Sequence, residues 1–205
     1  MDQRTRPAPR LGPLPPETTP ELGEQFDAMA RRMGFIPNSV LIMQRNPQMV
    51  RAFVQMADAI WAPAGGVDVK LKRLISHVAS RAAGCQYCMA HTAGGAARLG
   101  VEQQKIDAVW EYQTSPLFTA AERAALDVAV AAGCVPNAVT DAMFMQLRMH
   151  WSDEQVVEIV GVIAMFGFLN RWNDTFATPL EAEPMEFGEQ HLAAQGWDAG
   201  KHVRS

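Results

Sequence analysis

Cysteine is scarce in this chain: Cys85, Cys88 and Cys134 are the only three among 205 residues. Secreted proteins that depend on disulfides carry more cysteines and an even number of them, so the count argues against that class. Charge of one sign is also lacking, because the formal net charge is -4 and no stretch concentrates lysine and arginine. Without a basic stripe, no nucleic-acid partner is predicted.

Long hydrophobic runs are lacking too. The longest, residues 156–169, is interrupted by Glu158 and is shorter than the roughly 20 residues that cross a bilayer as a helix. We therefore expect a buried core helix there, no membrane partner and a cytoplasmic protein. Residues 1–17 hold five prolines and three arginines but no apolar segment, which argues against a signal peptide. They predict an extended Pro-rich arm, either disordered or laid across a neighbouring subunit.

Helical periodicity runs through the chain, and convincing strand alternation is absent. The pattern predicts an all-α domain over residues 18–178, preceded by the arm and followed by a looser C-terminal tail over residues 179–205. Asp68 is expected to cap one helix, and capping boxes are expected at residues 119–122 and 152–155. The predicted helices cover approximately residues 21–33, 38–43, 47–60, 68–84, 85–99, 101–112, 119–132, 137–150 and 152–172.

The segment that carries chemistry is Cys85-Gln-Tyr-Cys88-Met-Ala-His91. Cysteines three residues apart share a helix face and can form a disulfide, and His91 falls on the same face. His91 could take a proton from the Cys88 thiol or stabilise its thiolate. Because Cys85 and Cys88 open the predicted helix, the helix dipole is expected to lower the thiol pKa. A redox dithiol site is the leading hypothesis.

Other interpretations of the segment are weaker. A structural zinc site needs four ligands, whereas only three are local and Cys134 and His150 are distant. Covalent haem attachment needs a histidine directly after the second cysteine, which is not the case here. The remaining alternative is that Cys85 and Cys88 are simply small core residues. We expect no metal and no organic cofactor, and Cys134 as a bystander.

The all-α pattern with this cysteine motif resembles the carboxymuconolactone decarboxylase superfamily, and within it the alkylhydroperoxidase D-like, peroxidase-related branch. The resemblance spans about residues 34–174. It rests on the stretches Gly34-Phe-Ile-Pro-Asn-Ser-Val40, Leu71-Lys-Arg-Leu-Ile75, Gly84-Cys-Gln-Tyr-Cys88 with His91 and Thr92, and Ser152-Asp-Glu-Gln-Val-Val157.

The resemblance implies a trimeric or hexameric helical bundle that reduces hydroperoxides, with an external thiol as reductant. By the family pattern, Cys88 would be the peroxidatic nucleophile, Cys85 the resolving thiol, and His91 part of a proton relay. Members that decarboxylate lactones lack the cysteine pair.

The chain departs from the family pattern at Arg73, which stands where the family has its relay glutamate, and at Thr92, where the family has its histidine. Two groups could compensate. Arg73 could stabilise a thiolate, unless it is a surface or interface charge. His77, one turn later on the same face, could act as the base, unless it is a satisfied helix histidine.

The sequence thus predicts a thiol-dependent peroxidase of antioxidant defence with catalytic Cys88, Cys85, His91, His77 and Arg73. A thiol-disulfide oxidoreductase and a non-catalytic redox switch remain alternatives. A decarboxylase or isomerase of lactones on the same scaffold is less favoured.

Overall fold

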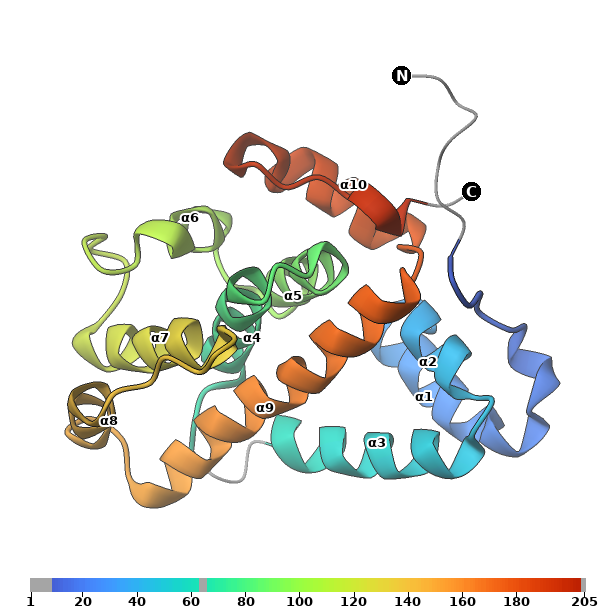
Figure 1. The fold of residues 1–205 in the computed structure, drawn as a ribbon, viewed down its shortest axis with the longest axis horizontal. Coiled ribbons are helices and arrows are strands. Elements are labelled where there is room, and N and C mark those ends of the chain that lie inside the picture. The colour runs from blue at the N-terminus through green and yellow to red at the C-terminus, as the bar shows by residue number, and fades with distance from the viewer. Residues whose placement is uncertain (1–8, 63–65, 204–205) are drawn as a thin grey trace.

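The computed structural model describes residues 9–62 and 66–203, and over these ranges it is helical with no strand. The predicted all-α class is therefore confirmed. The α-helices are α1 (Gly23–Met33), α2 (Asn38–Met43), α3 (Pro47–Trp61), α4 (Val69–Ala82), α5 (Gln86–Arg98), α6 (Gln103–Asp107), α7 (Ala120–Gly133), α8 (Asp141–Arg148), α9 (Asp153–Phe176) and α10 (Ala182–His191) (Figure 1).

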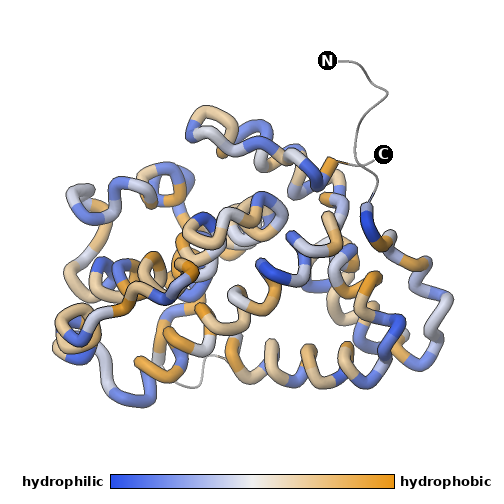
Figure 2. The backbone as a smooth tube through the Cα atoms, viewed as in Figure 1, coloured by the Kyte–Doolittle hydropathy of each residue, from blue (hydrophilic) through white to orange (hydrophobic). Residues whose placement is uncertain are grey.

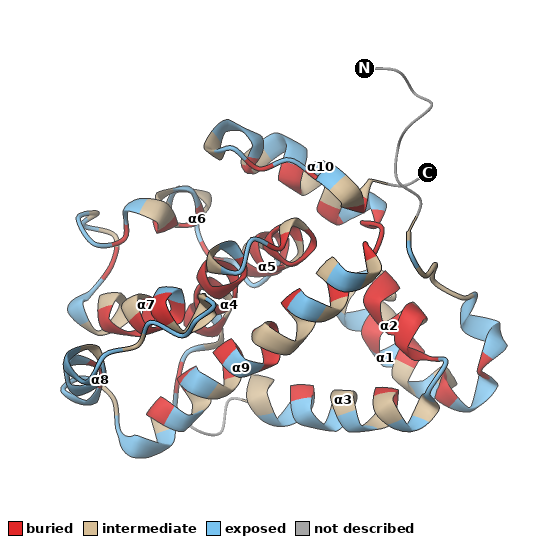
Figure 3. Cartoon of the chain, viewed as in Figure 1, coloured by how far each residue is buried: buried red, intermediate tan, exposed pale blue. Residues whose placement is uncertain are grey.

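The centre of the fold is α4, which packs against α5, α7 and α9. Its residues from Leu71 to Ser80 are buried, except Arg73. Figure 3 shows that burial is concentrated on α4 and α5, whereas α8 is mostly exposed. The small residues of α5 allow this close packing, because the helix buries Ala90, Ala93 and Ala96 completely against its neighbours.

The N-terminal helices form a second, smaller apolar cluster. Phe26 and Met29 of α1 join Val40 and Met43 of α2 and Val50 of α3. Phe168 and Trp172, from the C-terminal half of α9, pack against this cluster. Helix α9 therefore links the two apolar cores, and the space between them is where a cavity can form.

Helix α9 is long and apolar enough to cross a membrane by length and composition alone. Figure 2 shows hydrophobic residues along most of it, yet it contacts α3, α4, α5, α7 and α8. Lys72, which is 1% exposed, pairs with Glu158 of α9 at 2.8 Å. These contacts on several sides are those of a core helix, as the sequence predicts for residues 156–169.

Local sequence signals locate the helix starts well. The Asp68 cap and the capping boxes of Thr119 with Glu122 and of Ser152 with Gln155 are all present. The expected helix over 137–150 begins later, at Asp141, because the Thr140 hydroxyl caps it by accepting a hydrogen bond from the backbone N–H of Met143. The expected helix over 101–112 divides into α6 and a 3-10 turn, Ala108–Glu111.

Both the first and the last described segments pack against the helical domain. Residues 1–8 of the expected arm fall outside the described ranges, but the backbone N–H of Arg10 donates to Phe176 and that of Leu14 donates to Leu41. Residues 179–203, expected as a looser tail, include α10 and the 3-10 turns Ala193–Gln195 and Gly200–His202. Helix α10 packs along α5 (Figure 1), so this segment covers the helix that carries the cysteines.

Gly188 of α10 lies close to the Trp197 ring, which follows later in the same C-terminal segment. A Cβ atom at Gly188 would lie 2.5–2.7 Å from three atoms of the Trp197 ring, which is 6% exposed and donates to the Gln86 carbonyl. We expect Gly188→Ala to lower the free energy of unfolding in urea by about 1–3 kcal/mol, because the rigid ring must move. Gly23→Ala is the control, since a Cβ there meets nothing within 4 Å. Equal stability of Gly188→Ala and wild type would contradict this prediction.

Candidate active site

The two cysteines lie at the start of α5. Cys85 is the N-cap residue, and Cys88 lies in the first turn. Gly84, with φ of 75°, lets the chain leave α4 and begin α5 at once. Both cysteines are free thiols, and they lie within hydrogen-bonding reach of each other. A disulfide between them therefore requires little movement.

Cys88 lines a cavity of about 280 Å³ between the N-terminal helices and the main core. Cys85 is not among the lining residues and is completely buried. The walls are largely apolar and aromatic, and they include Phe53, Trp61 and Phe166. The volume is near the lower end for small-molecule sites, so the cavity suits a compact apolar ligand.

The pKa of Cys88 is raised rather than lowered, contrary to the sequence-based expectation. Burial is the main cause, and the hydrogen bond and charge of Cys85 act in the same direction. Asn173 opposes them, because its side-chain N–H donates to the Cys88 sulfur at 3.4 Å. The helix dipole does not compensate for removing the sulfur from water. Cys88 therefore needs a base when it reacts.

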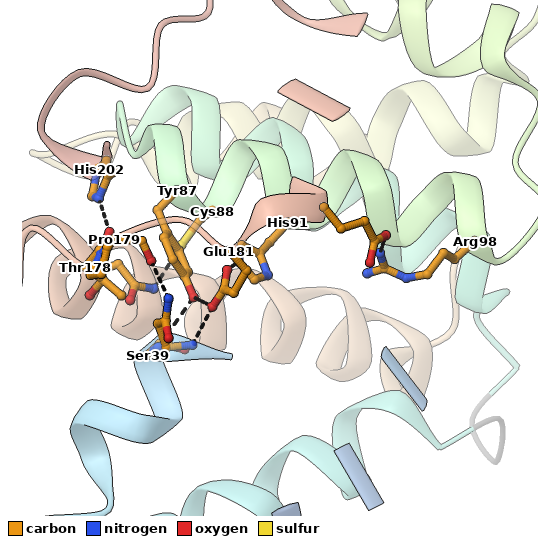
Figure 4. A network of polar contacts seen from close by, with 12 residues as sticks. Ser39, Tyr87, Cys88, His91, Arg98, Thr178, Pro179, Glu181 and His202 are labelled. Atoms are coloured by element: carbon orange, nitrogen blue, oxygen red, sulfur yellow. Dashed lines mark hydrogen bonds and ion pairs between the residues drawn. The ribbon is translucent and has the colours of Figure 1, made fainter. Parts of the chain in front are cut away.

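A histidine and a carboxylate form a hydrogen-bonded pair next to Tyr87 (Figure 4). His91 lines the same cavity, and its Nε2 lies 2.6 Å from the Glu181 carboxylate. Tyr87 donates its hydroxyl hydrogen to the other carboxylate oxygen at 2.8 Å and stacks on His91 with ring centroids 4.2 Å apart. When Nε2–H donates to Glu181, the Nδ1 atom of His91 is left free to accept a proton.

Glu181 is 5% exposed and is held as a carboxylate by its neighbours. Burial alone would raise its pKa, but the charge and hydrogen bond of His91 and the backbone N–H of Asn38 together lower it. Burial and the negative charge of Glu181 raise the pKa of Tyr87, which therefore remains a hydrogen-bond donor. Asn38 also fixes the segment that carries Glu181, since its side-chain N–H donates to the Pro179 carbonyl at 2.9 Å.

Sequence reasoning missed Glu181. The expected position of the relay glutamate is taken by Arg73, and the carboxylate instead comes from a residue 90 positions after His91. The Gly34–Val40 motif was an indirect sign of this contact. Its Asn38 donates through the backbone N–H to Glu181 and through the side chain to the Pro179 carbonyl.

Cys85 faces a different set of groups. Its sulfur, the carboxylate of Asp174 and a ring nitrogen of His202 lie within 4.8 Å of one another. Nδ1 of His202 lies 2.8 Å from the Thr178 carbonyl and donates to it, and burial lowers the pKa of the ring, whose neutral form then carries its lone pair on Nε2. That atom is buried and lies 3.5 Å from the Asp174 carboxylate. The trio could offer three donor atoms to a metal ion, one fewer than a closed zinc site needs.

His77 is fully buried outside the cavity lining. Its Nδ1 lies 2.9 Å from the Thr92 hydroxyl, which donates to the Cys88 carbonyl. Burial lowers the His77 pKa to about 3, so the ring is neutral at pH 7. Within the described residues, no hydrogen bond joins His77 to either cysteine.

Arg73 does line the cavity, on the wall formed by α4. It is not among the groups that shift the pKa of Cys88, so its predicted role in stabilising the thiolate gains no support from the charges around the sulfur.

Comparisons with known proteins agree with this geometry. Residues 47–131 match the Carboxymuconolactone decarboxylase family. The chain is also 36% identical to the debrominase Bmp8, covering 88% of this chain and 96% of that one with a TM-score of 0.83. The chain belongs to the carboxymuconolactone decarboxylase family. The resemblance drawn from the cysteine motif is thereby confirmed.

Bmp8 was crystallised in its apo form and as a cysteine-to-alanine variant in complex with 2,3,4-tribromopyrrole. An alkylhydroperoxidase AhpD core protein from Ralstonia eutropha JMP134, described as peroxidase-related, is 23% identical with a TM-score of 0.75. The match covers 98% of this chain and all of that one, and it shows that the fold is AhpD-like.

The uncharacterized protein YnjA of Escherichia coli (strain K12) is 28% identical over 115 residues. The match covers 56% of this chain and 63% of YnjA, so it extends over less than two thirds of that relative.

The pair of Glu181 and His91 generates a pH-dependent prediction. We expect Glu181→Gln to lower the free energy of unfolding at pH 7 by about 2–4 kcal/mol, because the buried donors around this side chain would lose their negatively charged acceptor. Since the folded-state pKa of Glu181 lies below 4.5, its contribution is present above that pH and is lost as the pH falls through the folded pKa. The difference should therefore shrink in acid.

Urea unfolding of both proteins at pH 7 and below pH 4 measures this effect. Glu183→Gln is a matched control, because Glu183 is half exposed in its pair with Arg98 and should matter little. A Glu181→Gln deficit that is independent of pH would contradict the assignment of Glu181 as a carboxylate.

Proposed function

We propose that this protein is a dithiol reductase of small apolar electrophiles, with Cys88 as nucleophile and Cys85 as resolving thiol. The observation that carries the proposal is the division of the two thiols. Cys88 lines the cavity of about 280 Å³, whereas Cys85 lies behind it, within hydrogen-bonding reach of Cys88. An intermediate formed on Cys88 would meet Cys85 without a large rearrangement.

The substrate class that we favour is a halogenated aromatic ring. The similarity to a debrominase over most of both chains supports it, as do the aromatic walls of the cavity. The Cys88 thiolate would remove the halogen from a ring carbon as a sulfur–halogen bond, and the electron pair left on carbon would take a proton. The Cys85 thiolate would then displace halide from sulfur. The ring is reduced by two electrons, and the two thiols become a disulfide.

Hydroperoxide reduction, implied by the family resemblance, is the second candidate. The Cys88 thiolate would attack the O–O bond, the alcohol would leave with a proton, and Cys85 would convert the sulfenic acid to a disulfide with loss of water. The observation that favours it is the network of Tyr87, Glu181 and His91 beside the cavity, which can supply the proton to the leaving oxygen.

In both reactions His91 would accept the proton of Cys88 and return it to the product, while Glu181 stabilises the positive charge in between. An external thiol reductant would reopen the disulfide. Protein disulfides are poor candidates as substrates, because Cys88 is 2% exposed and a folded partner could not reach it. We propose a cytoplasmic location, where cellular reductants keep such a pair reduced.

A homo-oligomer, trimeric or hexameric, belongs to the same proposal. Large apolar side chains that a monomer would leave in water support it. Three of them belong to α8, to its C-cap and to the start of α9: Met145, Met149 and Val157.

For the resolving thiol, the proposed proton acceptor is Nε2 of His202. The Cys85 proton would move to this buried lone pair as the sulfur attacks, and Asp174 would stabilise the imidazolium. Asp174 is itself fixed by Lys201, at 2.7 Å.

The first prediction concerns turnover. With dithiothreitol as reductant, we expect wild type to release bromide catalytically from 2,3,4-tribromopyrrole or 2,4,6-tribromophenol. Cys88→Ser should reduce release to background, and Cys85→Ser should permit a single event, since the intermediate cannot resolve. Cys134→Ser is the control and should turn over normally. Turnover of cumene hydroperoxide alone would favour the second candidate, and disulfide formation without turnover would favour a redox switch.

The second prediction concerns His202. We expect His202→Asn to slow disulfide formation by about 100-fold, because general bases contribute on this scale, while leaving the first attack by Cys88 unchanged. With peroxide as oxidant, the trapped sulfenic acid should accumulate as it does in Cys85→Ser. His150→Asn, at an exposed histidine, is the control. Protein treated with a chelator separates this effect from metal binding. Wild-type rates of disulfide formation in His202→Asn would exclude the role.

A further inference from the structure

Arg73 is a cationic residue of the cavity wall that has no role in the proposed chemistry. Its guanidinium lies with Cζ 3.9 Å from the centroid of the Trp61 ring. A Cβ atom placed on Gly95 would lie 3.3–3.4 Å from Nη1, Cζ and Nε of the same group. The near-equal distances show that the guanidinium lies flat against Gly95. The indole ring and α5 therefore both pack against the guanidinium, and its N–H donors point from its edge.

Those donors have no protein partner. Nε of Arg73 is buried without a hydrogen bond, and within residues 9–62 and 66–203 the guanidinium forms no ion pair and no hydrogen bond. The acidic residue on the cavity lining, Asp58, pairs with Arg32 at 3.5 Å. A cation that is partly removed from water and has no anion is costly, and the contact with Trp61 offsets only part of the cost.

The surroundings of Arg73 are positive. Burial is the main cause that lowers its pKa, to about 10, and the charges of Arg98 and Arg32 contribute. Arg73 is still a cation at neutral pH. Arg32 also lines the cavity, but it is paired with Asp58, and Arg98 is paired with Glu183. Arg73 is therefore the arginine of this group whose side chain forms no ion pair within the described residues, and the fork of its guanidinium suits a carboxylate.

We propose that the ligand of this cavity is a compact apolar molecule with a carboxylate, bound by the edge of Arg73. The inference rests on the proposed function in one respect, since it makes the carboxylate the group that directs the reacting atom to Cys88. Gly95 and Cys88 are two helical turns apart, which is about 10 Å along the axis of α5. One aromatic ring with a carboxylate at one end and an electrophilic substituent at the other spans such a distance.

Equilibrium binding of benzoate and benzamide tests the proposal without any turnover. The two probes share shape and size, and they differ in charge. We expect reduced wild-type protein to bind benzoate at least about tenfold more tightly than benzamide, as one buried charge-assisted contact would give. In Arg73→Met, whose side chain can still cover Trp61, the ratio should fall to about one. Arg73→Lys keeps the charge without the fork and should give an intermediate ratio.

The matched control is Arg171→Met, which removes an exposed arginine outside this cavity and should keep the wild-type ratio. A ratio near one in wild type would overturn the proposal, as would a ratio unaffected by Arg73→Met. If Arg73→Met fails to fold, the wild-type and Arg73→Lys ratios still decide. Binding of benzoate by Cys88→Ser, which carries no nucleophilic thiol at the site, separates failure of this inference from failure of the dithiol chemistry.

Discussion

A carboxylate removed from water must find donors, and the way Glu181 meets this requirement organises the site. Its two oxygens take hydrogens from three donors in two separated parts of the chain: the Asn38 backbone, the Tyr87 hydroxyl and His91. The first belongs to the N-terminal helices and the other two to α5. Because a buried carboxylate without these donors is strongly disfavoured, the contacts hold the N-terminal helices, the helix that carries the cysteines and the start of α10 in one arrangement. The cavity lies between these parts.

The two thiols experience opposite surroundings although they are three residues apart. Cys88 faces a largely apolar cavity, and its neighbours favour the protonated thiol. Cys85 faces Asp174 and the free lone pair of His202, beneath the C-terminal segment. This division coincides with the helix start, where Cys85 is the N-cap residue and Cys88 lies in the first turn. A dithiol that must react in a fixed order benefits from such asymmetry.

The sequence predicted what depends on neighbours along the chain. Thr119 and Ser152 were recognisable as helix caps because their partners lie three residues later, and Cys85, Cys88 and His91 form one segment. Glu181 and His202 were not recognised, because their roles arise only when the C-terminal segment folds back over α5. The pKa direction of Cys88 was wrong for a related reason. The helix start was visible in the sequence, whereas the extent of burial was not.

The position of the dithiol within the matched stretch has a further consequence. Residues 47–131 include Cys85, Cys88 and His91, but Asn38, Asn173, Asp174, Glu181 and His202 all lie outside. The stretch shared with the family thus carries the two cysteines and His91, whereas the flanking segments carry several of the polar groups around them. Substitutions in the segments before and after this stretch could therefore change the reaction while the two cysteines stay the same. Such modularity would let a single scaffold hold both peroxidase-related proteins and a debrominase.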